Sequence, residues 1–122
     1  MPRLFSAAIA LSLLAAPAWA QPAHIVFFAD WSGAIDVAAQ NVIGQAATEA
    51  KQSPDKDITV TGYADSSGSA QANIYLTQLR AQRVIDAMIA DGVPASRLNM
   101  VAAGRQAQAG VASRRVEIAI GQ

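Results

Sequence analysis

The chain has 122 residues, which is the length of one domain, and it carries nine basic and nine acidic residues. This balance argues against a nucleic-acid-binding surface, because such a surface needs an excess of basic residues. The chain has no cysteine and one histidine, so disulfides and cysteine nucleophiles are excluded and packing alone must hold the fold.

Residues 1–20 are predicted to be a secretory signal peptide. One early positive charge, Arg3, precedes an apolar run at 4–16, and a proline then leads to the small-residue sequence AWA at 18–20. A membrane anchor is the alternative, but the apolar run is shorter than the roughly 20 residues that span a bilayer. With no cysteine at the cleavage site for a lipid anchor, residues 21–122 are expected to form a single domain without a membrane anchor.

The first half of the predicted mature chain alternates strands and helices. An apolar, β-rich run at 24–29 predicts a strand, and the spacing of apolar residues over 34–51 predicts a helix. Asp36 is a candidate N-cap of that helix. A proline-containing loop is expected at 52–57, followed by a strand with period-two alternation at 58–63.

The second half contains the strongest helical pattern, at 71–90, after a Ser- and Gly-rich loop at 66–70. An Asp-Gly pair and a proline end that helix. Strands are expected at 98–102 and 115–120, with a loop of small and polar residues at 104–113. The order β-α-β-α-β-β predicts one α+β domain, a sandwich of a mixed sheet with its helices packed on one face.

Sequence motifs of enzymes are absent. His24 is the only histidine, and the chain contains no G-x-S-x-G elbow, glycine-rich phosphate loop or EF-hand spacing. A Ser-His-Asp arrangement stays open, because geometry rather than sequence order defines a triad. We therefore expect a protein that is not an enzyme and that has no metal or cofactor.

Arg80 and Asp65 form the most informative pair of charges. On a helical wheel, Arg80 falls in the apolar stripe, where its five N–H donors need partners such as a carboxylate. Asp65 follows the second predicted strand and can lie over the first turns of the helix. The two residues either pair with each other or bind a zwitterionic ligand. The residues alone favour the internal pair, because buried charges are usually paired within the protein.

Several motifs in fixed order resemble the OmpA-like peptidoglycan-binding domain. They are IVFFADWSGAID at 25–36, GYADSSG at 62–68, NIYLTQLRAQRV at 73–84, GVPASRL at 92–98 and RRVE at 114–117. The resemblance covers nearly all of the predicted mature chain. The family includes the C-terminal module of OmpA, peptidoglycan-associated lipoproteins and MotB-type stator proteins. The resemblance implies the OmpA-like α+β fold and non-catalytic binding of peptidoglycan.

The resemblance also implies roles for individual residues. Asp65 and Arg80 match the aspartate and arginine with which the family grips the diaminopimelate of the peptidoglycan stem peptide. Asn73, on the same helix face as Arg80, is expected to hydrogen-bond the peptide. Arg114 is expected beside the site from the start of the last strand, or else to be a solvated edge charge. Asp30 is the candidate for the polar contact from the loop after the first strand.

Some positions depart from the family pattern, which is expected to weaken or narrow ligand binding. Ala29 stands in a loop where many members have an acidic residue, Ala64 replaces the commoner threonine, and Ser113 replaces asparagine. The loop at 104–113 is shorter than in most members. Trp31 is interpreted either as a core aromatic that covers the sheet, which we favour, or as a platform that stacks on a sugar ring.

The sequence thus predicts a periplasmic, cell-wall or outer-membrane-associated protein without catalytic activity. Its predicted partner is peptidoglycan, through stem-peptide diaminopimelate, with an envelope protein as a second candidate partner and no nucleic acid. The alternative is a protein-interaction module of the envelope that keeps the OmpA-like fold but has lost cell-wall binding.

Overall fold

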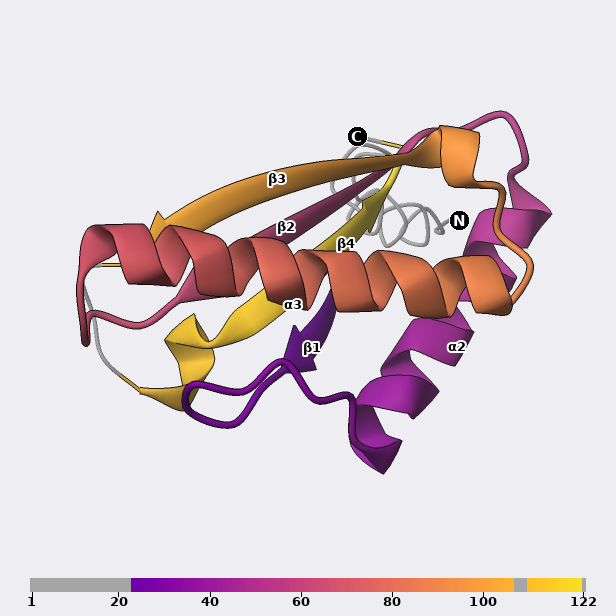
Figure 1. The fold of residues 1–122 in the computed structure, drawn as a ribbon. Helices are drawn as coiled ribbons and strands as arrows, with labels where there is room; N and C mark the ends of the chain where they lie inside the picture. Colours follow the sequence, from indigo (N-terminus) through magenta and orange to yellow (C-terminus); the bar gives the residue numbers. More distant parts are fainter. Residues whose placement is uncertain (1–22, 107–109, 122) are drawn as a thin grey trace, which may run out of the picture.

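The computed structural model describes residues 23–106 and 110–121, which form a four-stranded sheet with two α-helices on one face (Figure 1). The elements are β1 (His24–Phe27), α2 (Val37–Gln52), β2 (Ile58–Ala64), α3 (Ala70–Ala90), η3 (Ala95–Arg97), β3 (Leu98–Arg105), η4 (Val111–Ser113) and β4 (Arg115–Ile120). The predicted β-α-β-α-β-β order, the α+β fold class and the mixed sheet are confirmed. The predicted signal peptide, residues 1–20, lies outside the described residues.

The strand order is β1-β4-β2-β3, so the first and last strands are neighbours. β4 runs antiparallel to both β1 and β2, with Val26 opposite Val116 and Val60 opposite Ile118. β2 and β3 are parallel and are joined through α3, as a crossover connection requires. The C-terminal ends of β1, β2 and β3 therefore meet the start of β4 at one end of the sheet.

The core lies between the sheet and the two helices. Burial alternates along β2, so that Ile58 and Val60 face the helices while Thr59 and Thr61 face the other side. The core residues are Val26, Phe28, Ala39, Ile43, Ala46, Ala47, Ala50, Ile58, Val60, Ala81, Val84, Ile85, Met88, Val93, Val116 and Ile118. Neither helix within residues 23–106 and 110–121 is both long and apolar enough to cross a membrane.

Both helices begin at side-chain caps. Asp36 caps α2 as predicted, accepting a hydrogen bond from the backbone N–H of Ala39 at 2.8 Å. The predicted start at Ala34 is too early, because the cap residue keeps an extended backbone. Ser69 caps α3 in the same way. α3 ends at the predicted Asp-Gly pair, where Gly92 adopts a φ of 101°.

β3 is longer than the sequence predicts. A strand ending at Ala102 and a loop over 104–113 were expected, but the strand continues to Arg105 and η4 forms part of the remainder. The ladder to β2 shifts register before Gly104, which has a φ of 76°. Most residues of this edge strand are exposed without alternation, so the end of the strand lacks the period-two pattern by which a strand is predicted. Residues 107–109 lie outside the described part.

Candidate functional site

Three connections meet at the end of the sheet where β1, β2 and β3 terminate. Their residues line a narrow, partly open cavity that has no room for a water molecule in this conformation. Its lining residues are Asp30, Trp31, Ala64, Asp65, Ser67, Asn73, Leu76, Arg80 and Arg114. The fold thus brings all five residues predicted to bind ligand (Asp30, Asp65, Asn73, Arg80 and Arg114) to one small cavity.

Arg80 is fully buried on the inner face of α3, as the helical wheel predicts. Its guanidinium donates from Nε to the carbonyl of Ser32 at 2.8 Å and from Nη2 to the carbonyl of Ala29 at 3.0 Å. A longer contact of 3.5 Å joins Nη1 to the carbonyl of Tyr63. The ring of Phe28 lies 5.3 Å from the guanidinium carbon, within cation–π range. Arg80 therefore holds the β1–α2 turn against α3.

These contacts leave part of the Arg80 guanidinium available. Arginine has five N–H donors, and contacts within the described residues use three of them, one at a long distance. Burial and the neighbouring Arg114 lower the pKa of Arg80, while Asp65 and Asp30 raise it. The side chain stays charged at all physiological pH values. A buried cation with two remaining N–H groups beside a cavity is suited to bind a carboxylate.

Asp65 is buried and accepts hydrogen bonds at both carboxylate oxygens. Its Oδ1 accepts from the backbone N–H of Ser67 at 3.0 Å and from the hydroxyl at 2.6 Å. Its Oδ2 accepts from Nη1 of Arg114 at 3.1 Å. The Ser67 hydrogen bonds, helped by Arg114 and opposed by burial, lower the pKa of Asp65 to about 2. Asp65 is therefore an anion at neutral pH.

The ion pair of Asp65 is made with Arg114 and not with Arg80, so the internal pair that the residues alone favour is not the one that forms. Arg114 also donates from Nε to the carbonyl of Phe28 at 3.3 Å. The alternative for Arg114, a solvated edge charge, is wrong for the same reason. The sequence contains both partners, but their contact depends on how β4 pairs with β1 and β2.

Asn73 and Asp30 differ in how firmly they are held. Asn73 is buried, and its amide nitrogen donates to the carbonyls of Ser67 and Ser69. It thereby fixes the loop that presents Asp65, and its Oδ1 is the atom left to accept from a ligand. Asp30 is exposed at the tip of the β1–α2 turn and makes no ion pair within the described part of the chain.

Trp31 is not a core aromatic, so the favoured sequence interpretation is wrong. Trp31 is 51% exposed and lines the cavity. The turn that carries it is closed by a hydrogen bond of 3.2 Å from the N–H of Ser32 to the carbonyl of Ala29. A φ of 51° at Trp31 is unusual for a bulky residue and costs about 1–3 kcal/mol. The tight turn directs the indole to the cavity instead of the sheet.

Gly68 makes room for this indole. A Cβ atom added at Gly68 would lie 2.5 Å from Cη2 of Trp31, closer than atoms can approach. Ser67 was missed as a site residue by sequence reasoning, and Trp31 was considered at the site only as the less favoured interpretation. Ser67 could have been found, because an aspartate at a strand end commonly accepts from the N–H two residues later. No comparable signal exists for Trp31, whose position depends on the turn.

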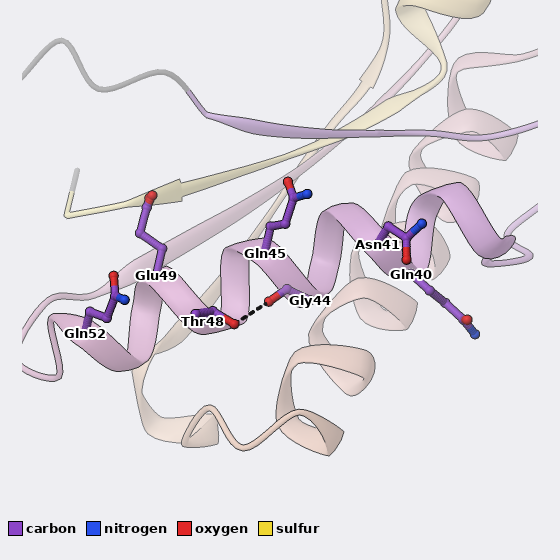
Figure 2. A pocket seen from close by; sticks show the side chains of 7 residues that line it. All are labelled: Gln40, Asn41, Gly44, Gln45, Thr48, Glu49 and Gln52. Atoms are coloured by element: carbon purple, nitrogen blue, oxygen red, sulfur yellow. Dashed lines mark hydrogen bonds between the residues drawn. The ribbon is translucent and has the colours of Figure 1, made fainter.

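A larger and more open hollow lies along α2 and is lined by Gln40, Asn41, Gly44, Gln45, Thr48, Glu49 and Gln52 (Figure 2). In the described part of the chain, all its lining residues belong to one helix, and Thr48 bonds only to the carbonyl of Gly44. Such a hollow is an exposed helix face without convergent charges. No three metal-ligating side chains gather within residues 23–106 and 110–121. The smaller charged cavity is therefore the candidate site.

Comparison with known proteins points to one family. The model of the OmpA family matches residues 27–118. The probable lipoprotein YiaD of Escherichia coli is 34% identical over an alignment of 103 residues, which covers 78% of this chain and 47% of that protein. The peptidoglycan-associated lipoprotein of Agrobacterium fabrum is 33% identical over 81 residues, 66% of this chain and 46% of that protein. The chain thus spans about half the length of these relatives.

Solved structures give the same result for the fold. The peptidoglycan-associated lipoprotein of Burkholderia pseudomallei superposes with a TM-score of 0.73 at 26% identity, over 80% of this chain and 89% of the other. The C-terminal domain of Helicobacter pylori MotB gives a TM-score of 0.70 at 24% identity, over 80% and 84% of the two chains. Both likenesses agree with the mixed sheet and the helices described above.

Proposed function

Because this chain belongs to the OmpA family, we propose that it is a non-catalytic protein of the periplasm that binds peptidoglycan. In this proposal, the cavity between Asp65 and Arg80 holds the diaminopimelate of the stem peptide. Relatives that are named for peptidoglycan association or binding support the cell wall as the ligand. The domain resemblance supports diaminopimelate as the recognised group.

The observation that carries the proposal is the buried Arg80 guanidinium, which has N–H groups to spare beside an anionic Asp65. Two cations, Arg80 and Arg114, and two anions, Asp65 and Asp30, line the cavity, so its formal charge is balanced. A zwitterion keeps this balance when it binds. In this conformation the cavity has no room for a water molecule, so the charged end of an amino acid can enter it only when lining side chains such as Arg114 move.

Binding would proceed by exchange of partners. The ligand carboxylate accepts hydrogen bonds from the remaining N–H groups of Arg80 in the fork geometry that guanidinium offers. The ligand ammonium donates to Asp65, where it competes with Arg114. The Arg114 side chain is 20% exposed and can turn toward solvent when the ammonium arrives. No bond is made or broken in the ligand.

The test is co-sedimentation of the full chain with purified peptidoglycan sacculi. Asp65→Asn keeps the shape and the acceptor for Ser67 but removes the charge, so we expect at least tenfold weaker binding (about 1.4 kcal/mol). Asp55→Asn, in the exposed loop before β2, is the matched control and should bind like the wild type. Arg80 is a poorer probe, because it also holds the β1–α2 turn.

The result also separates the proposal from the alternative of an envelope protein-interaction module. Circular dichroism of each variant establishes that it is folded. A folded wild-type protein that stays in the supernatant would contradict wall binding and favour the interaction module. Sedimentation of Asp65→Asn at the wild-type level would leave wall binding intact but remove this cavity as its site.

A further inference from the structure

Among the described residues that line the charged cavity, Trp31 is the one large aromatic. Leu76 and Ala64 are its apolar neighbours on the lining, while the other lining residues are polar or charged. About half of the indole is exposed, so the side chain adds little to the hydrophobic core. The cavity therefore has a charged interior and an apolar surface where it opens to solvent.

The indole is held in place by the same side chain that would bind the ligand carboxylate. Arg80 donates to the carbonyls of Ala29 and Ser32, the first and last residues of the turn that carries Trp31. Gly68 has no side chain, and this leaves room for the indole to lie beside it. These contacts keep Trp31 in a left-handed backbone conformation that a bulky residue rarely adopts. An exposed aromatic kept in such a conformation beside a binding cavity is a mark of function.

We propose that Trp31 forms an apolar subsite for the hydrocarbon chain that follows the charged head of the ligand. This inference rests on the proposed function of the cavity. Trp31 lies on the same lining as Asp65 and Arg80 and is half exposed, so a ligand whose charged head binds those two residues extends past the indole toward solvent. Methylene groups on an aromatic face are removed from water, and this removal favours binding. The site thus prefers one kind of amino acid to another. Amino acids that carry an aliphatic chain behind the charged head bind better than short amino acids.

The test is an NMR titration of the full chain with free meso-diaminopimelate and, separately, with alanine, which has the charged head without the chain. Trp31→Asn removes the indole, and asparagine tolerates the positive φ, so the variant is expected to fold. We expect roughly tenfold weaker binding of diaminopimelate to Trp31→Asn, with unchanged binding of alanine. Trp31→Phe keeps an aromatic face and should lie close to the wild type.

Three other outcomes are distinguishable. Equal binding of diaminopimelate to the wild type and to Trp31→Asn overturns the subsite and leaves the proposed function standing. Loss of binding confined to sugar-bearing wall fragments overturns it as well, because Trp31 would then stack on a sugar ring. A folded wild type that binds neither small ligand contradicts the proposed function of the cavity, and the inference falls with it.

Discussion

Arg80 binds carbonyl oxygens of a turn that lies about 50 residues earlier in the chain. The helical pattern predicts that Arg80 faces the core, and the structure confirms this burial. Its partners could not be predicted from the residues, because backbone carbonyls at Ala29 and Ser32 have no sequence signature. The same is true of the Asp65–Arg114 pair, whose two members come together only when β4 joins the sheet.

Replacing Arg80 by lysine tests this structural role. Lysine keeps the charge, but its single ammonium group cannot reproduce the planar fork that reaches both turn carbonyls. We expect Arg80→Lys to lower the free energy of unfolding by about 2–4 kcal/mol, measured by urea denaturation. Arg83→Lys, on the exposed face of α3, is the control and should change it by less than about 0.5 kcal/mol. Equal effects of the two changes would contradict the role of Arg80 in holding the β1–α2 turn against α3.

The low pKa of Asp65 makes stability depend on pH. The folded value of about 2 is below the unfolded value of about 3.9, so the unfolded state takes up the proton first. The stabilisation is fully present above about pH 4 and is lost as the pH falls toward 2. We expect the urea midpoint of the wild type to approach that of Asp65→Asn over this range. A difference that stays constant from pH 5 to pH 2 would refute the assignment.

At the scale of elements, the close contact between β2 and α3 depends on a glycine. A Cβ atom at Gly62 would overlap the backbone carbonyl of Thr77, so any side chain there would push the helix away from the sheet. The sequence places this glycine near the end of a predicted strand, and that placement is right. The need for a glycine at this position comes from the tertiary structure. The contact joins β2 to α3, and no local sequence pattern specifies the distance between two such elements.

Two glycine-to-alanine changes should therefore have opposite effects. Gly62→Ala is expected to lower the free energy of unfolding by about 1–3 kcal/mol, since the helix must shift. Gly44→Ala lies in the middle of α2 with open space around the new methyl group and should raise it by up to about 1 kcal/mol. Thermal unfolding followed by circular dichroism measures both. A loss of stability in Gly44→Ala would contradict the open surroundings of that position, and unchanged or higher stability in Gly62→Ala would contradict the close contact with Thr77.

The order and type of the elements were predictable because capping residues and periodicity are local signals. Asp36, the Asp-Gly stop after α3 and the alternation in β2 each have such a signal. The end of β3 has none, because most of the residues of an edge strand are exposed like those of a loop. The exposed position of Trp31 also had no local signal, since an aromatic residue near a strand is usually in the core.

At the scale of the whole molecule, the helices cover one face of the sheet and the described elements leave the other face open. Ile25, Phe27 and Val101 are between 38% and 48% exposed. Arg115 on this open face pairs with Glu117 at 2.7 Å and lies over the ring of Tyr63 at 4.0 Å. The charged cavity occupies one end of the sheet. Its assembly from three separate connections was expected only from the family resemblance, since no spacing in the sequence predicts it.

The pairing of the first and last strands has a mechanical consequence. The chain enters the sheet at His24, opposite Ile118, and β1 then runs toward the end of the sheet that holds the cavity. If a ligand holds the cavity end and tension acts on the chain before His24, the force runs along the axis of β1. Hydrogen bonds between antiparallel strands lie across that axis, so they are sheared together and are not opened one after another. A sheet loaded in this direction resists separation of its first strand.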